Sequence, residues 1–292
     1  MPPFLPDPDR TGVVRVADGR HVAWSEWGAE NGRPVLMQPA GGMSGGLGLD
    51  AGAVRDLGIR LVGFDRPGMG RSDPHAEGTL VSWADDVRQA VHARELRRPL
   101  ALGVSLGAPF ALAIAAAGVV EAAAWVAGTD DLAHPAFAAV LAPAVAATVE
   151  EARERPAALR ERLASVTPDE VADRWTREGS DRDRAVLEDE GLAERFRPPL
   201  REGFRSGAGS YARDVELALG AWPFAPEDVA VPVDVWYGSE DAYPSHAPDR
   251  GWRLATRLPR GRQLVVPGEG GTLAWTRGRE VLRLLLRAPE RP

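Results

Sequence analysis

The sequence predicts an α/β fold, in which one mostly parallel sheet has helices on both faces and carries an all-helical insertion. Short apolar segments alternate with segments of helical periodicity over residues 1–129. The alternation stops over residues 130–225, where the segments have only helical patterns, and it resumes over residues 226–292. Alternating strands and helices form parallel sheets. We therefore expect a core made of residues 1–129 and 226–292, with a helical lid formed by residues 130–225.

Composition and charge exclude several classes of protein. The chain has 292 residues, of which 44% are hydrophobic and 26% charged, as in globular proteins. The net charge of −7 argues against nucleic acid as a partner. The absence of cysteine excludes disulfides and thiol catalysis. No apolar run has membrane-spanning length and the N-terminus lacks the pattern of a signal peptide, so we expect a cytoplasmic protein without a membrane partner. The oligomeric state is left open.

The elements of the predicted core follow the apolar pattern in order. Before the lid, strands are expected over 12–16, 21–27, 34–38, 60–64, 100–104 and 122–127, and helices over 51–57, 81–94 and 108–117. After the lid, the order is a strand over 231–237, a helix over 246–258, a strand over 262–266 and a helix over 273–286. Within the lid, helices are expected over 135–149, 156–166, 168–177 and 183–196, each near a Pro, Asp or Thr start signal.

The segment Gly103-Val104-Ser105-Leu106-Gly107 joins a predicted strand to an Ala-rich predicted helix. Strand, sharp turn and helix are the context of a nucleophile elbow, which holds a serine hydroxyl at the carboxyl end of a sheet. Side chains at Gly103 or Gly107 would clash with the neighbouring strand and helix. The N–H of Leu106, at the start of the helix, is a candidate oxyanion donor.

Four motifs occur in register along the chain. They are Phe64-Asp65-Arg66-Pro67-Gly68-Met69-Gly70-Arg71-Ser72-Asp73-Pro74, the elbow at Ser105, Gly238-Ser239-Glu240-Asp241, and Pro267-Gly268-Glu269-Gly270. Together they cover nearly the whole chain and resemble the α/β-hydrolase family, in its lid-containing bacterial branch. The resemblance implies an α/β-hydrolase fold with a sheet of the eight-stranded type, and no cofactor or metal.

The resemblance also implies roles for particular residues. Ser105 matches the nucleophile, and Asp241, after the penultimate strand, matches the acid of a triad in the order Ser, Asp, His. The oxyanion loop of the family usually begins with His-Gly, where this chain has Pro39-Ala40. Proline has no N–H to donate. The amide of Gly41 is therefore the expected partner of the Leu106 amide in an oxyanion hole.

The position that matches the family's histidine holds Gly271. Glycine offers no base, so the predicted triad is incomplete, with Ser105 and Asp241 but no histidine. Among the five histidines, His134 and His75 follow predicted strands and are the candidate alternative bases. We expect His246, five residues after Asp241, to lie in the first turn of the helix over 246–258.

The sequence thus predicts an enzyme that acts on a small apolar ester, lactone or thioester in a pocket over Ser105. Trp175, Trp222 and Trp275, near the lid, support an apolar cavity. Loss of the histidine leaves two alternatives. One is a non-hydrolytic cyclase, lyase or isomerase of secondary metabolism, and the other is a catalytically dead ligand-binding protein.

Overall fold

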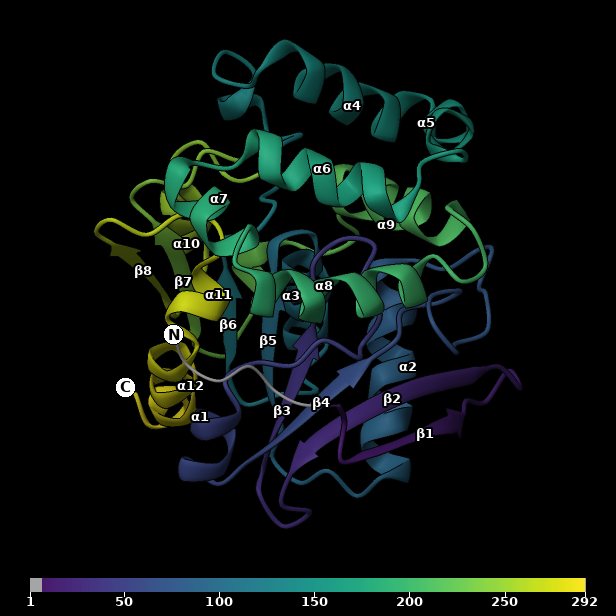
Figure 1. The fold of residues 1–292 in the computed structure, drawn as a ribbon, viewed down its shortest axis with the longest axis vertical. Coiled ribbons are helices and arrows are strands. Elements are labelled where there is room, and N and C mark those ends of the chain that lie inside the picture. The colour runs from purple at the N-terminus through teal and green to yellow at the C-terminus, as the bar shows by residue number, and fades with distance from the viewer. Residues whose placement is uncertain (1–6, 292) are drawn as a thin grey trace.

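One eight-stranded sheet organises the protein. The computed structural model describes residues 7–291. The strands are β1 (Arg10–Arg15), β2 (His21–Gly28), β3 (Arg33–Gln38), β4 (Ile59–Phe64), β5 (Leu100–Val104), β6 (Ala123–Val126), β7 (Val233–Gly238) and β8 (Gly261–Val266). Their spatial order is β1-β2-β4-β3-β5-β6-β7-β8. Strand β2 pairs antiparallel with β1 and β4, and the other neighbours pair in parallel (Figure 1).

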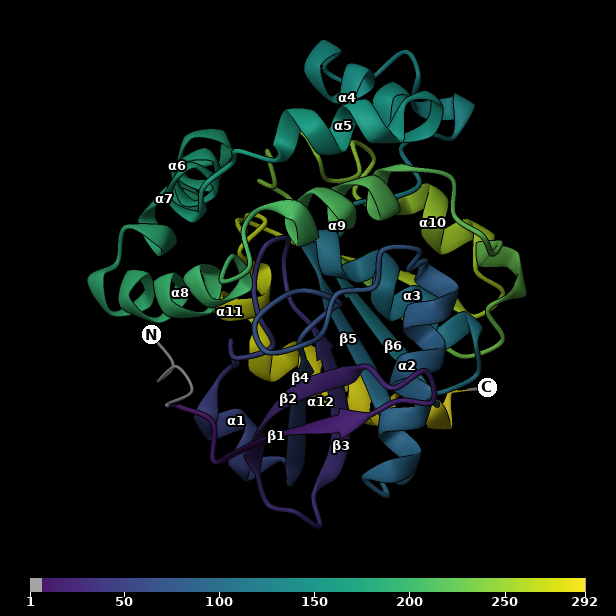
Figure 2. The ribbon, with the colours of Figure 1, turned by 90° about the vertical axis from the view of Figure 1, so that its right-hand side faces the viewer.

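Helices cover both faces of the sheet. They are α1 (Ala51–Asp56), α2 (Leu80–Ala93), α3 (Ala108–Ala116), α10 (Trp252–Arg257), α11 (Leu273–Thr276) and α12 (Gly278–Arg287). Helices α2 and α3 pack together on one face, and α1 and α12 pack together on the other (Figure 2). The fold class predicted from the sequence, an α/β-hydrolase fold with a helical insertion, is confirmed.

The insertion between β6 and β7 is helical. It contains α4 (Pro143–Glu154), α5 (Pro156–Leu163), α6 (Pro168–Glu178), α7 (Asp181–Leu187), α8 (Glu190–Gly203) and α9 (Gly209–Leu219). Figure 1 shows these helices above the carboxyl ends of the parallel strands. Proline at the first position and the capping boxes of Thr167 and Ser180 fix where several of them begin. The exact division of the chain at residues 130 and 225 stays a prediction.

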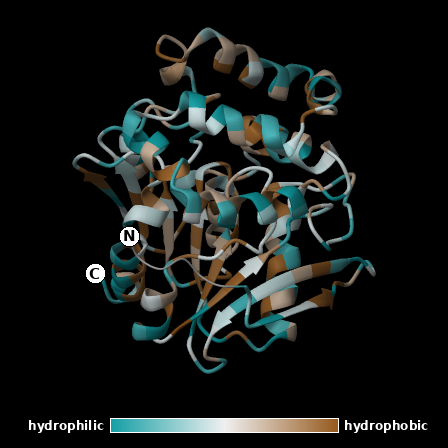
Figure 3. Cartoon of the chain, in the orientation of Figure 1, coloured by the Kyte–Doolittle hydropathy of each residue, from teal (hydrophilic) through white to brown (hydrophobic). Residues whose placement is uncertain are grey.

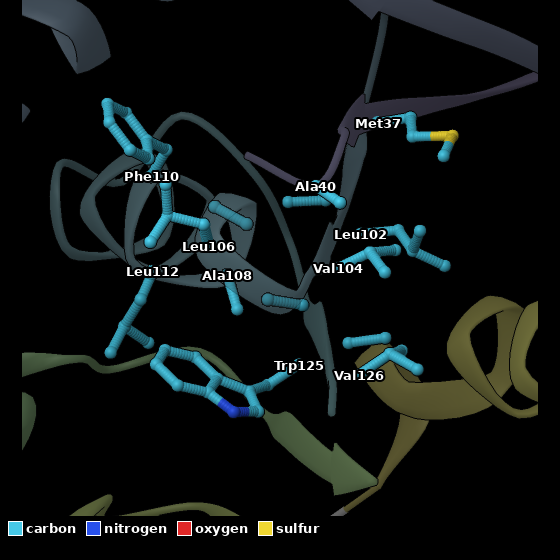
Figure 4. Close-up of a cluster of buried hydrophobic side chains, with 14 of the residues drawn as sticks. Met37, Ala40, Leu102, Val104, Leu106, Ala108, Phe110, Leu112, Trp125 and Val126 are labelled. Carbon is cyan, nitrogen blue, oxygen red and sulfur yellow. The ribbon is translucent and has the colours of Figure 1, made fainter. Parts of the chain in front are cut away.

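The core lies between the sheet and the helices, and β5 and α3 are at its centre. All five residues of β5 are buried, and so are eight of the nine residues of α3. Figure 4 shows Phe110, Leu112 and Trp125 among the apolar side chains around the start of α3. Figure 3 shows the apolar residues gathered on the strands, while polar residues colour much of the helical layer. Among the described residues, no helix has the length and apolar character needed to cross a membrane.

Each strand lies within two residues of its predicted position, but several helices differ. The helix expected over 246–258 begins only at Trp252, because turns occupy residues 244–245 and 248–251. The segment over 183–196 is two helices, because Asp189 caps a new helix. The helix over 273–286 breaks at Arg277. Helix α9, which begins without a side-chain cap, was not predicted.

Candidate active site

The turn after β5 has the predicted form of a nucleophile elbow. Ser105 has φ of +50°, a strained value for a residue with a side chain. A Cβ atom on Gly103 would lie 2.6 Å from the Cα of Ala108, and one on Gly107 would lie 2.2 Å from the carbonyl oxygen of Pro39. Both positions therefore require glycine. This close packing lets the chain turn at Ser105 directly from strand to helix.

A histidine lies between Ser105 and Asp241. The Oγ atom of Ser105 is 2.8 Å from Nε2 of His246. The Nδ1 atom of the same ring is 2.8 Å and 3.0 Å from the two carboxylate oxygens of Asp241. An ionised Asp241 accepts the Nδ1–H, which leaves the lone pair of Nε2 facing the serine hydroxyl. The His246 and Asp241 side chains are only 5% and 3% exposed, so this hydrogen-bonded chain is shielded from water.

A tight loop after β7 brings His246 to this position. The Asp241 carboxylate accepts a hydrogen bond from the N–H of Tyr243 at 3.2 Å, and the N–H of His246 donates to the carbonyl of Tyr243 at 3.0 Å. The loop therefore folds back on itself before α10 begins. Two expectations from the sequence are wrong here. His246 was expected in a helix but lies in the loop, and Ser105 was expected to have no histidine beside it but contacts His246. Pro244 between Asp241 and His246 was the available signal, because proline in such a segment favours a turn.

The space beside Gly271, where the resemblance places a histidine, is filled by Tyr243 from the loop after β7. Gly271 lines the cavity, and a Cβ atom on it would lie 2.5 Å from Cδ2 of Tyr243 and 3.0 Å from the Asp241 carboxylate. The preceding Gly270 has a similar constraint, since its Cβ would lie 2.3 Å from the carboxylate of Asp183 in α7. That buried carboxylate accepts hydrogen bonds from the N–H and hydroxyl of Thr272, both at 2.8 Å. Gly271 is thus surrounded by fixed groups.

The two alternative bases lie elsewhere. The Nδ1 atom of His134 accepts a hydrogen bond from the N–H of Ala136 at 3.2 Å and caps the short helix at Pro135–Phe137. His75 lies in the loop after β4, where its carbonyl accepts from Gly78. Neither residue lines the cavity at Ser105. The expectation that either could act as its base is therefore not supported, because His246 occupies the place beside the hydroxyl.

The loop after β3 lies against the elbow. A Cβ atom on Gly41 would be 2.8 Å from the side chain of Leu106, and both residues line the cavity. The guanidinium of Arg66 donates to the carbonyls of Pro39 at 2.8 Å and Ala40 at 3.2 Å. Because the C=O and N–H of a trans peptide point in opposite directions, these bonds turn the amides of Ala40 and Gly41 away from Arg66.

Arg66 is itself held by the helical insertion. Its Nε donates to the carboxylate of Asp214 in α9 at 2.6 Å, and its guanidinium lies 4.9 Å from the ring centroid of Phe110. The Arg66 side chain is 0% exposed and that of Asp214 is 5% exposed. Burial raises the pKa of Asp214, and the adjacent guanidinium opposes that rise. The ion pair therefore connects α9, the loop after β3 and the nucleophile helix.

A cavity of about 350 Å³ lies over Ser105 and beneath the insertion. Trp175, Phe196 and Trp275 form an aromatic wall, in which the Phe196 ring centroid lies 6.4 Å from that of Trp175 and 4.6 Å from that of Trp275. Trp222 is not part of it and packs against Trp125 and Phe224 instead. Two residues of the lining, Arg174 and Glu178, have side chains of the charged type. The cavity suits an apolar molecule with few polar groups.

A second carboxylate, Asp130, lies near the carboxyl end of β6. It is 1% exposed, and burial raises its pKa to about 7, with the charges of Asp249 and Asp131 adding to the rise. One of its oxygens accepts from the N–H of Asp131 at 2.6 Å, and the other has no hydrogen-bond partner in the described chain. Asp130 is not the carboxylate beside His246, because the Nδ1 atom of that histidine contacts Asp241. No group of three or more candidate metal ligands occurs within residues 7–291.

Known proteins resemble this chain along most of its length. The sequence profile described as the Alpha/beta hydrolase family matches residues 12–283. A non-heme chloroperoxidase of Streptomyces lividans is 31% identical over 99 residues, which are 33% of this chain and only 36% of that protein. The enol-lactonase of Burkholderia xenovorans LB400 has 19% identity and a TM-score of 0.69, covering 94% of this chain and 99% of its own. A thermophilic esterase of Thermogutta terrifontis has 17% identity and a TM-score of 0.69, with 97% and 100% covered.

Proposed function

The chain belongs to the alpha/beta hydrolase family, and we propose that it hydrolyses a small ester, lactone or thioester through Ser105, His246 and Asp241. The observation that carries the proposal is the hydrogen-bonded chain from the Ser105 hydroxyl through His246 to the buried Asp241 carboxylate. A serine hydroxyl is a weak nucleophile and needs an adjacent, oriented base. His246 has the position for that role, and the Asp241 carboxylate beside Nδ1 favours the tautomer that leaves Nε2 free to accept the proton.

The proposed reaction begins with attack of the Ser105 oxygen on the acyl carbon. As the C–O bond forms, Nε2 of His246 takes the hydroxyl proton, and the Asp241 carboxylate stabilises the imidazolium that results. The carbonyl electrons move to the acyl oxygen. The amides of Leu106 and Gly41 would stabilise this oxyanion, since both residues line the cavity beside Ser105.

The second half of the proposed reaction uses the same groups. The oxyanion collapses, the bond from the acyl carbon to the leaving oxygen or sulfur breaks, and His246 gives its proton to that atom, which leaves an acyl group on Ser105. Water then enters, gives its proton to Nε2 of His246 and attacks the acyl carbon. As this second oxyanion collapses, the bond from the acyl carbon to the Ser105 oxygen breaks, His246 returns its proton to that oxygen, and the acid is released. No cofactor is needed for any of these steps.

The lining and the volume of the cavity support a small, largely apolar acyl compound as the substrate. Its aromatic wall and its volume of about 350 Å³ leave room for a small molecule rather than a polymer. An esterase and an enol-lactonase are among the proteins with a similar fold. The non-hydrolytic and ligand-binding alternatives depended on an unpartnered serine, and the short distance from Ser105 to His246 favours hydrolysis over both.

Covalent labelling and kinetics test the proposal together. The wild-type protein should hydrolyse 4-nitrophenyl acetate or butyrate, and a fluorophosphonate reagent should label Ser105, as located by peptide mass spectrometry. Ser105→Ala and His246→Ala should each lower kcat by roughly 10⁴- to 10⁶-fold, because triad members act as a unit. Asp241→Asn should lower it by about 10⁴-fold, because the wrong imidazole tautomer is then favoured.

Matched histidine variants provide the control. His134→Ala and His75→Ala remove histidines that do not line the cavity, so both should keep the wild-type rate and labelling. An active His246→Ala variant, or an inactive His134→Ala variant with intact circular dichroism, would contradict the assignment of His246. A wild-type protein that neither hydrolyses esters nor takes the label would contradict the proposed function.

A further inference from the structure

The apolar cavity is lined by a cation, Arg174, that has no ion pair with any described carboxylate. Arg174, on α6, lines the cavity and is half-buried. Its Nη1 atom donates to the hydroxyl of Tyr211 at 3.2 Å, and no carboxylate of the described residues forms an ion pair with it within 4.0 Å. Burial raises the pKa of Tyr211, so this hydroxyl is a neutral partner. The guanidinium of Arg174 therefore has N–H donors left for another group.

None of the described carboxylates around Arg174 lies within ion-pair distance of it, although its charge contributes to lowering the pKa of Glu170. Glu170, one helical turn before, accepts hydrogen bonds from the N–H and hydroxyl of Thr167 as part of a capping box. Asp214, on the facing helix α9, is paired with Arg66. Glu178, one turn after, also lines the cavity without an ion pair to Arg174. Its negative charge contributes to raising the pKa of both Tyr211 and Tyr243.

The position of Arg174 relative to the reaction centre is set by Tyr211. A Cβ atom on Gly41 would lie 3.5 Å from Cε2 of Tyr211, so the edge of the phenol ring faces the loop expected to hold the oxyanion. The hydroxyl at the end of that ring contacts Arg174. Tyr211 therefore contacts Arg174 through its hydroxyl and faces that loop with its ring, and Arg174, Tyr211 and Gly41 all line the cavity. A carboxylate there would be separated from the reacting carbonyl by a short chain.

We propose that Arg174 binds a carboxylate of the substrate, so that the preferred substrates are esters or lactones carrying a second, anionic end. This inference rests on the proposed hydrolase function and specifies its substrate class. The apolar wall would contact the chain between the two ends, and the guanidinium would take the carboxylate in a charge-assisted, two-donor hydrogen bond. Tyr211 then positions the guanidinium rather than neutralising it.

Two esters of equal shape and different charge test the inference. Monomethyl adipate carries a carboxylate, and the methyl ester of adipic monoamide replaces it with a neutral amide. The wild-type protein should have a KM about 10- to 100-fold lower for the monomethyl ester, the range expected for a hydrogen bond between charged groups. Arg174→Gln should remove this preference by raising the KM of the charged ester about 10- to 100-fold, while the KM of the amide changes far less.

Glu178→Gln is the matched control on the same helix. It removes the one carboxylate that shares the cavity with Arg174, so it should leave the KM of the charged ester unchanged or lower it. Equal KM values for the two esters in the wild-type protein, with no change in Arg174→Gln, would overturn the inference and leave the hydrolase function standing.

Equilibrium binding separates the two proposals if no ester is turned over. Adipate, which cannot be hydrolysed, is titrated calorimetrically into the wild-type protein, Arg174→Gln and Glu178→Gln. Binding that weakens at least about tenfold in Arg174→Gln alone supports the anion site even without catalysis. Binding that is absent in the wild-type protein, or that is equal in the wild-type protein and Arg174→Gln, overturns it.

Discussion

The ring of Tyr243 fills the space that a side chain at residue 271 would need. A Cβ atom on Gly271 would lie 2.5 Å from Cδ2 and 2.8 Å from Cε2 of that ring, distances that Cβ atoms do not adopt. Tyr243 comes from the loop that also places His246 beside Ser105, and its ring centroid is 5.0 Å from that of His246. The glycine and the histidine are therefore parts of one arrangement.

We predict that Gly271→His lowers activity instead of supplying a base. The imidazole must displace Tyr243, and the loop from Asp241 to His246 moves with it. A displacement of about 1 Å at such a site costs about 10²-fold in rate, so kcat/KM for 4-nitrophenyl butyrate should fall to that extent. Gly271→Ala should show part of the same loss.

Gly278→Ala is the control for this variant. A Cβ atom on Gly278 would meet nothing within 4 Å, so the substitution should leave kcat/KM unchanged. Tyr243→Ala combined with Gly271→His opens the space again and should recover part of the loss. Faster hydrolysis by the single variant Gly271→His than by the wild-type protein would mean that residue 271 is a vacant base position.

The strands and the elbow could be predicted because their causes are local. Each strand is a short apolar run, and the Gly-x-Ser-x-Gly pattern that marks the turn at Ser105 lies within five consecutive residues. The family resemblance added the acid Asp241, at the end of β7. These features depend on residues that are neighbours in sequence.

The partner of Ser105 could not be predicted in the same way. The resemblance directs attention to the loop after β8, where Gly271 lies, whereas the contact from His246 depends on how the loop after β7 folds back. Its proximity to Ser105 is a tertiary contact across 141 residues of sequence. Helix α9 was missed for a local reason, since Ala208 at its start provides no side-chain cap.

We predict that the ion pair between Arg66 and Asp214 affects both stability and the oxyanion loop. Arg66→Met leaves a buried, unpaired carboxyl at Asp214 and should lower the free energy of unfolding by about 3–5 kcal/mol. The carbonyl of Pro39 then loses its donor and that of Ala40 keeps only the N–H of Met43 at 3.2 Å, so the Gly41 amide should turn and kcat should fall by about 10²-fold. Chemical denaturation and ester kinetics measure the two effects.

The double variant Arg66→Met/Asp214→Leu separates stability from positioning. It removes both charges and should regain most of the lost stability, because an apolar pair can replace a buried ion pair. Its kcat should stay low, since the Pro39 carbonyl then has no donor among the described residues and the Ala40 carbonyl has only the N–H of Met43. Arg201→Ala, which removes an exposed pair with Asp169 at 3.8 Å, should change neither quantity. Full recovery of kcat in the double variant would argue against a positioning role for Arg66.

Asp130 should make stability fall as the pH rises towards neutrality. Its pKa is about 7 in the folded protein and near 3.8 in the unfolded chain, because burial disfavours the carboxylate. Between these values the folded state binds more protons than the unfolded state, so the free energy of unfolding decreases with pH and levels off above about 7. Asp130→Asn cannot ionise and lacks this dependence. Relative to the wild-type protein, the variant should therefore gain on the order of 4 kcal/mol in the free energy of unfolding between pH 4 and pH 8.

Urea unfolding of both proteins at several pH values measures this difference, and the exposed Asp181→Asn serves as the control. A difference that stays constant from pH 4 to pH 8 would mean that Asp130 is ionised throughout and has a partner in solution.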